Sequence, residues 1–224
     1  MKKNMNGQNM KINIGCGKTP TLDWINYDNS LSIRLSKFPL LSSFLSQIGL
    51  ISADQKELIL AARKYGIKWA NATKKIPHSS GTVQAIYTSH MVEHLDREEI
   101  GLFLDEAYRV LQPGGVIRIV VPDLRTLVES YLKDNDADQF VDSLLLSTGQ
   151  PKDLISKIKL LVVGYRQHLW MYDGYSLSKL LVKHGFDEPV IMEPGTTNID
   201  DYGELNLYER AETSVCVEAR KPNQ

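Results

Sequence analysis

The strongest constraint on the fold is one run of sequence in which a capped helix, a tight turn and an apolar strand follow one another. The run is DREEIGLFLDEAYRVLQPGGVIRIVVP, residues 96–122. Asp96 is a candidate N-cap with Glu99 three residues later, and apolar residues then recur at helical spacing. Pro-Gly-Gly at 113–115 ends the helix and turns the chain into an apolar strand. A helix that leads into a buried strand in this way is typical of a parallel α/β sheet.

Short apolar segments on both sides of this run extend the alternation. Strands are predicted at 11–14, 24–28, 66–71, 84–89, 116–122, 189–193 and 213–220, with a second helix at 175–186. Residues 213–220 alternate apolar and polar side chains, as an antiparallel strand with one buried face does. The sequence therefore predicts an α/β domain with a mostly parallel seven-stranded sheet, an antiparallel last strand and helices on both faces.

Two stretches, about 30–65 and 124–164, do not fit the alternation. Their apolar stripes at helical spacing are Leu41, Phe44, Leu45 and Ile48, then Leu127, Val128, Tyr131 and Leu132, and finally Leu154, Ile155, Ile158 and Val162. We expect helical insertions at the carboxyl ends of strands, where a lid over a ligand would sit. Residues 1–10 are expected to be a disordered tail, and 11–222 a single domain.

Composition narrows the possible partners. The formal net charge of -1 argues against a nucleic-acid surface, which needs a basic excess. Cys16 and Cys216 cannot form a disulfide framework, which favours the cytoplasm. No segment is apolar enough to span a bilayer. The stripe at 41–48, near Arg34 and Lys37, leaves peripheral membrane contact open beside its interpretation as a lid or core-covering helix. The oligomeric state is left open.

The first strand ends in a glycine pair, Gly15 and Gly17, which indicates that the backbone approaches a ligand closely. A dinucleotide fingerprint needs a third glycine, but Pro20 stands in its place. Only about a dozen residues separate Gly15 from Asp28, against about 20 for a full crossover helix. A carboxylate at this position suits the hydroxyls of a sugar. A nucleoside is therefore favoured over a dinucleotide.

Several segments together resemble a known family. INIGCG, NATKKIP, AIYTSHMVEHL and YRVLQPGGVIRIVVPDL are similar, in order and spacing, to the class I S-adenosylmethionine-dependent methyltransferases. Within the small-molecule group that carries VLxPGG, the chain is most similar to a bacterial branch common among polysaccharide-assembly genes. The resemblance covers 11–123 and 168–222. It implies a Rossmann-like sheet, S-adenosylmethionine as cofactor and a small-molecule or glycan acceptor.

The resemblance also implies which residues bind the cofactor. They are Gly15, Cys16, Gly17, Asp28, Asn71, Ala72 and Ser89. The glycine backbone would meet the methionyl carboxylate and the ribose, with Cys16 as a spacer, and Asp28 would accept from both ribose hydroxyls. Asn71 and the backbone of Ala72 would bind the adenine edge. The family usually has aspartate where Asn71 stands, so this acceptor is neutral and weaker. Taken singly, Asp28 is equally explained as a helix cap and Asn71 as a turn residue.

Three residues are candidates for the methyl-transfer chemistry. A hydroxyl acceptor must lose a proton while it is held in line with the methyl carbon, so a histidine or carboxylate should lie within reach. We predict His90 or His168 as the general base and Asp123 as an orienting or sugar-binding residue. Asp123 is equally well explained as a helix cap. The less favoured alternative for His90 is that it only packs on the adenosine.

The segment HMVEH, residues 90–94, matches the H-x-x-E-H spacing of inverted zinc peptidases. It begins at the end of a strand rather than within a helix, so the context of a hydrolase is missing. Some methyltransferases hold magnesium with a similar E-x-x-E-H cluster, for which Glu93, His94 and His168 could serve with His90. We nevertheless predict no metal ligand, because many relatives use this Glu-His pair structurally.

The sequence thus predicts a methyltransferase that acts on oxygen of a small molecule or saccharide. A non-catalytic cofactor-binding or scaffold protein of the same fold stays open, because Asn71 and Gln84 both depart from commonly acidic positions. A metal-dependent H-x-x-E-H hydrolase is the other alternative. The acceptor is not identified, because its specificity would lie in the two insertions.

Overall fold

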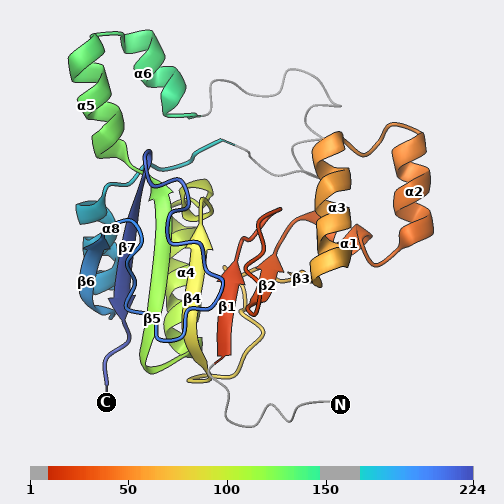
Figure 1. The fold of residues 1–224 in the computed structure, drawn as a ribbon, viewed down its shortest axis with the longest axis horizontal. Coiled ribbons are helices and arrows are strands. Elements are labelled where there is room, and N and C mark those ends of the chain that lie inside the picture. Colours follow the sequence, from red (N-terminus) through yellow and green to blue (C-terminus); the bar gives the residue numbers. More distant parts are fainter. Residues whose placement is uncertain (1–9, 147–166, 224) are drawn as a thin grey trace.

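Seven strands form one sheet in the order β3-β2-β1-β4-β5-β7-β6 in this computed structural model, which describes residues 10–146 and 167–223 (Figure 1). The strands are β1 (Met10–Ile14), β2 (Ile25–Asp28), β3 (Lys68–Trp69), β4 (Val83–Ser89), β5 (Leu111–Pro122), β6 (Asp187–Met192) and β7 (Ser214–Arg220). Neighbouring strands from β3 through β5 pair in parallel, and β7 runs antiparallel between β5 and β6. The predicted fold class is confirmed.

Most of the helices begin at a side chain that caps them, whereas α2 (Pro39–Gln47) begins after Phe38 without a side-chain cap. The helices are α1 (Leu31–Leu35), α2 (Pro39–Gln47), α3 (Ala53–Tyr65), α4 (Arg97–Val110), α5 (Leu124–Asp134), α6 (Ala137–Ser143) and α8 (Gly174–Lys183), with a 3-10 turn η1 (Val92–His94). The predicted box is present at α4: Asp96 accepts from the backbone N–H of Glu99, and the Glu99 side chain accepts from that of Asp96. Strand β5 begins at Leu111, earlier than predicted, because Leu111 already pairs with Val83 across the irregular Pro-Gly-Gly segment.

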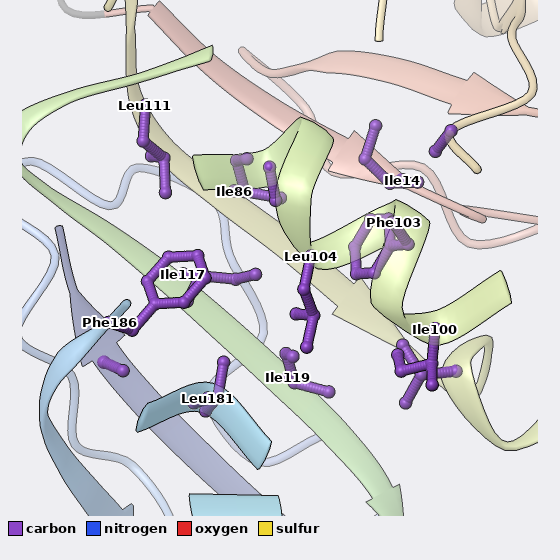
Figure 2. Packing of buried hydrophobic residues seen from close by; sticks show 14 of the residues in the cluster. Ile14, Ile86, Ile100, Phe103, Leu104, Leu111, Ile117, Ile119, Leu181 and Phe186 are labelled. Carbon is purple, nitrogen blue, oxygen red and sulfur yellow. The ribbon is translucent and has the colours of Figure 1, made fainter. Parts of the chain in front are cut away.

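The main core lies between the sheet and two helices, α4 and α8 (Figure 1). Figure 2 shows Leu104 of α4 beside Ile119 of β5, Phe103 of α4 toward Ile14 of β1, and Phe186 next to Ile117. On the opposite face of the sheet a second cluster forms. It contains Trp24, Ala85, Tyr87, Val116, Val120, Ile199 and Leu205. Its last two members come from the loop between β6 and β7, so a loop covers that part of the sheet.

The two stretches outside the alternation are partly helical. Helix α3 connects parallel strands β2 and β3, and α2 is the outermost helix beyond it (Figure 1). The α2 stripe stays exposed, with Phe44 57% and Ile48 52% accessible, so it does not cover the core. Helices α5 and α6 project past the carboxyl end of β5 (Figure 1). Between them, the ring centroids of Tyr131 and Phe140 are 5.1 Å apart.

Parts of the sequence-based expectation fall outside the described residues. These are the stripe Leu154, Ile155, Ile158 and Val162, and the tail except for Met10, which belongs to β1. Across 10–146 and 167–223, the structure contains no helix that combines the length and apolarity needed to cross a membrane.

Candidate functional site

The predicted site residues meet at one edge of the sheet because the parallel strands all end there. Gly15 follows β1, Asp28 ends β2, Asn71 comes two residues after β3, His90 follows β4 and Asp123 follows β5. The strand order reverses between β1 and β4, and the crevice outside such a reversal is where open α/β sheets bind ligands. The placement of the predicted residues therefore agrees with a ligand site at this edge.

The connection from β1 to β2 is a loop, which was predicted from its shortness, and a buried side chain folds it. The Asn26 amide oxygen accepts from Thr21 N at 2.9 Å, and its NH₂ group donates to the carbonyls of Thr21 and Trp24. Asn13 donates to Thr21 and to Asn26 from the neighbouring strand β1. These bonds stabilise the loop between β1 and β2 without a crossover helix, because they satisfy the buried polar groups of the loop.

Asp28 joins the glycine turn to β2. Its Oδ2 accepts from Gly17 N at 3.1 Å, and its Oδ1 accepts from Ser30 N at 2.8 Å. An ionised carboxylate has about four lone-pair sites, so each oxygen keeps capacity for a further donor. Burial raises the pKa of Asp28, and the two backbone N–H groups oppose that rise. The carboxylate is thus pre-oriented and half-buried, as a group that binds two vicinal hydroxyls needs to be.

Gly15 lies directly against the segment that follows β4. Its φ is +71°, and a Cβ added there would stand 2.5 Å from Met91 Cγ and 2.8 Å from Met91 Cβ. Gly17 is also left-handed, with φ of +51°, but its added Cβ would meet nothing within 4 Å. The first glycine is therefore needed for a close approach of two loops, and the second only for its backbone conformation.

Asn71 and Ala72 follow β3, which ends at Trp69 and not at Asn71 as predicted, and Asn71 already uses its amide oxygen. Oδ1 accepts from Thr73 N at 3.1 Å and from Thr73 Oγ1 at 2.8 Å, which is the local turn interaction. Asn71 lines a hollow of about 800 Å³, whereas Asp28 lines another of about 390 Å³. An adenine at this position would find the Asn71 amide NH₂ and the backbone more available than its oxygen.

Cys16 and Ser89 complete the set predicted to bind the cofactor. Cys16 is buried against Ile33, Ala62 and Ile67, and burial raises the pKa of its thiol well above the usual range. A thiol in that environment is a packing group and not a nucleophile. Ser89 ends β4, and its buried hydroxyl has no hydrogen-bond partner among the described residues.

His90 stands in a row of three polar groups. Its Nδ1 lies 3.2 Å from Glu93 Oε1, and its Nε2 is 3.0 Å from Ser214 Oγ. The backbone of His90 is left-handed, with φ of +50°, while its N–H still bonds to Val120 O at 2.9 Å. A non-glycine residue rarely adopts this conformation, and such strain concentrates at functional sites. A carboxylate, an imidazole and a hydroxyl that lie in a row can transfer a proton from the hydroxyl to the imidazole.

Asp123 has the structural role that competed with its predicted one. It caps α5, because Oδ1 accepts from Arg125 N at 3.1 Å and Oδ2 from Thr126 Oγ1 at 2.9 Å. Its backbone N–H bonds to Thr213 O, next to Ser214. The residue therefore lies near His90 in the fold, but its oxygens already serve the helix end.

His168 is brought to the same edge by backbone pairing far along the chain. Leu169 N and Trp170 N both donate to Glu93 O, at 2.8 and 3.2 Å. The His168 side chain is buried, and its ring centroid lies 5.2 Å from that of His94. Burial lowers the pKa of His168, while the charge of Glu93 opposes this effect. The H-x-x-E-H segment thus lies next to a third histidine, His168. The segment contains only a short 3-10 turn, η1, and no longer helix.

Sequence reasoning missed several residues of this edge. Met91 contacts the glycine turn, Asn26 folds the loop, and Ser214 contacts His90 from β7. Only Asn26 had a signal in the sequence, because it is a polar residue inside a mostly apolar strand. The contacts of Met91 and Ser214 join segments distant in sequence, so no local pattern marks them.

Comparisons with known proteins agree with this geometry. The family model described as a methyltransferase domain matches residues 38–119. Among solved structures, a possible histamine N-methyltransferase from Thermotoga maritima, described as S-adenosylmethionine-dependent, is 18% identical, with a TM-score of 0.52 over 97% of this chain and 84% of that one. An S-adenosylmethionine-dependent methyltransferase from Methanosarcina mazei is 14% identical, with a TM-score of 0.53 over 98% and 95%. None of the curated protein sequences matches the chain. At these identities the structural likeness concerns the fold.

Proposed function

We propose that the chain is a class I S-adenosylmethionine-dependent methyltransferase, as the match of residues 38–119 to a methyltransferase domain and the shared fold support, and that it methylates an oxygen of a small-molecule or saccharide acceptor. When bound, the cofactor supplies the activated methyl group. The fit rests on Asp28, whose oxygens keep acceptor capacity for the ribose hydroxyls. The backbone at Gly15 and Gly17, the Asn71–Ala72 segment and the end of β4 at Ser89 would hold the remainder.

One observation carries the choice of oxygen as the acceptor atom: the row Glu93, His90, Ser214 at the end of β4. His90 Nδ1 lies on the side of the Glu93 carboxylate and Nε2 faces Ser214 Oγ, so Nε2 is the ring nitrogen that a hydroxyl at this position would meet. In the proposed reaction an acceptor hydroxyl takes the place of the Ser214 hydroxyl and gives its proton to Nε2. Deprotonation raises the nucleophilicity of the oxygen, and positioning supplies the rest of the acceleration.

The saccharide part of the proposal is supported by the surroundings of this row. Trp170 is 44% exposed two residues after His168, and Arg97 lies 4.7 Å from its ring centroid. An exposed indole beside polar groups forms a surface that is partly apolar and partly polar. Sugar rings have the same mixture of apolar faces and polar hydroxyls, so the two surfaces are complementary. The helices α1–α3 and α5–α6, at the two insertions within the domain at 11–222, would line the acceptor side.

The test is a methyl-transfer assay over hydroxyl-bearing saccharides, small alcohols and matched amines. We expect turnover with a hydroxyl acceptor, and a fall of about 10²- to 10⁴-fold in kcat for His90→Asn. Asparagine tolerates φ of +50° better than other residues, so the backbone is preserved while the base is removed. S-adenosylhomocysteine affinity should be unchanged in the variant. Transfer to amines alone, or full activity of His90→Asn, would refute the proposed chemistry.

A further inference from the structure

Three of the five histidines of the chain gather around one buried carboxylate. The Glu93 cluster, defined as Glu93, His94 and His168, offers one ligand atom from each residue, and these atoms lie within 4.8 Å of one another. We propose that this cluster binds a divalent first-row transition ion such as Zn²⁺, contrary to the expectation from the sequence that no residue here is a metal ligand.

The first argument is the unpaired charge of Glu93. Its side chain is 1% exposed, and neither carboxylate oxygen has a hydrogen-bond partner among the described residues. The nearest nitrogen, His90 Nδ1 at 3.2 Å, is not aligned as a donor. A buried carboxylate without a partner is strongly unfavourable, and a bound cation is one of the few ways to compensate it.

The second argument is the tautomer of the two imidazoles. His94 Nδ1 lies 3.0 Å from Gln167 O, and His168 Nδ1 lies 2.9 Å from Leu144 O. A carbonyl oxygen can only accept, so in both rings Nδ1 carries the proton and Nε2 carries the lone pair. Histidines that ligate metals are held in this way, with the second nitrogen donating to a backbone carbonyl.

The distances suit ligand closure with small movements. A tetrahedral ion with ligands at about 2.1 Å separates them by about 3.4 Å. The ligand atoms, which lie within 4.8 Å of one another, therefore need to approach by no more than about 1.4 Å. The backbone around the cluster is already braced, because Leu169 N and Trp170 N bond to Glu93 O.

The donor set selects the kind of ion. Two imidazoles and one carboxylate suit Zn²⁺ and its neighbours, whereas Mg²⁺ prefers oxygen ligands and keeps its waters. Three protein ligands leave a position for water or for a ligand oxygen. Use of that position to bind the acceptor rests on the proposed function, but metal binding itself does not.

The experiment measures metal binding without donor or acceptor. Protein stripped with a chelator is titrated with Zn²⁺ and, separately, with Mg²⁺, and bound metal is counted after dialysis. We expect one Zn²⁺ per chain, no Mg²⁺, and a rise in Tm that depends on the Zn²⁺ concentration. His94→Ala and His168→Ala should each lose the ion, while His184→Ala, which removes a histidine paired with Asp105 elsewhere, should keep it.

Glu93→Gln distinguishes a metal ligand from a structural residue. Without metal, this isosteric change removes an unpaired buried charge, so Tm should stay equal or rise relative to the wild type. With Zn²⁺, the wild type should gain Tm and the variant should not. If the wild type binds no Zn²⁺, or if Glu93→Gln and both histidine variants bind it as the wild type does, the proposal is wrong. The Zn²⁺ dependence of the wild-type Tm gives this answer even where a variant fails to fold.

Discussion

Gly17 donates its backbone N–H to Asp28 Oδ2 over 3.1 Å, so the glycine turn and the second strand share one carboxylate. The bond fixes the side chain before any ligand arrives. It also explains how a loop can replace the crossover helix at this position, because Asp28 ties the glycine turn to β2 while Asn26 folds the residues between them. Affinity for the nucleoside and order of the loop should therefore depend on the same group.

Asp28→Asn tests this dependence. An amide presents one oxygen and one NH₂ group, so either Gly17 N or Ser30 N loses its acceptor and faces a donor instead. The variant also cannot accept from both ribose hydroxyls. We expect S-adenosylhomocysteine to bind at least about tenfold more weakly, which corresponds to about 1.4 kcal/mol, as measured by calorimetry.

The matched control is Glu129→Gln, which neutralises an exposed carboxylate on α5 that is paired with Arg125. Its affinity should equal that of the wild type. Unchanged binding in Asp28→Asn would mean that the ribose is held elsewhere, and the assignment of this edge would have to be abandoned.

The two glycines of the turn should respond differently to alanine. Gly17→Ala imposes only a left-handed conformation, at a cost of about 1 kcal/mol. Gly15→Ala adds a clash with Met91 to the same cost, because the new Cβ would stand 2.5 Å from Cγ. We expect Gly15→Ala to lower both stability and S-adenosylhomocysteine affinity more than Gly17→Ala does.

Met91→Ala provides the check, because it removes Cγ, the nearer of the two Met91 atoms that the new Cβ would meet, and leaves only Cβ at 2.8 Å. In a double-mutant cycle followed by denaturant unfolding, Gly15→Ala and Met91→Ala together should cost less than the sum of the two single changes. Strict additivity would show that the close approach of these loops has no energetic consequence.

Two Arg–Glu pairs of the protein should differ sharply in their effect on stability. Arg118 Nη1 lies 2.6 Å from Glu218 Oε1 between β5 and β7, with side chains only 2% and 1% exposed. Glu218 also accepts from Thr197 Oγ1 and Asn198 N, so it anchors the loop that covers the sheet. Glu218→Gln leaves a buried guanidinium without its counter-charge, and we expect a loss of about 3–5 kcal/mol in the free energy of unfolding.

The contrasting pair is Arg125 and Glu129, whose side chains are 63% and 65% exposed. Arg125 Nε lies 3.0 Å from Glu129 Oε1. Solvent screens this pair, so Glu129→Gln should leave the denaturation midpoint unchanged within error. The comparison uses chemically identical groups, and equal effects in the two variants would contradict the assignment of the difference to burial.

The success of sequence reasoning here depended on how local each signal was. The cap of α4 lies within one element and was predicted as the structure shows it. Strand β7 is antiparallel as predicted, but its polar face is buried as well, because Glu218 pairs there with Arg118. The α2 stripe shows the limit: periodicity identifies an apolar face but not its partner, and α2 leaves Phe44 and Ile48 exposed. The Glu93 cluster shows a second limit, because His168 reaches it only through backbone pairing between distant segments.

The pH dependence of stability should have a component from His78. Its Nε2 is 3.0 Å from Tyr27 Oη, and burial, followed by the charges of Lys68 and Arg109, lowers its pKa. Burial also raises the pKa of Tyr27, so at neutral pH the phenol keeps its proton and donates to the neutral imidazole. The unfolded chain, with a histidine pKa of about 6.5, binds this proton more readily than the folded one. Stability from His78 is therefore complete above about pH 6.5 and is lost as the pH falls toward the lowered pKa.

His78→Phe isolates this component. Phenylalanine can keep the edge-on ring contact with Tyr27, which has a centroid distance of 5.7 Å, but it cannot be protonated. Denaturant unfolding of both proteins at pH 7.5, 6.5 and 5.5 should show a midpoint that falls less steeply with acid in His78→Phe. The variant should be the less stable of the two at pH 7.5, because the Tyr27 hydroxyl loses its acceptor. Parallel pH profiles would show that His78 has the same pKa folded and unfolded, and the role of burial at this position would be wrong.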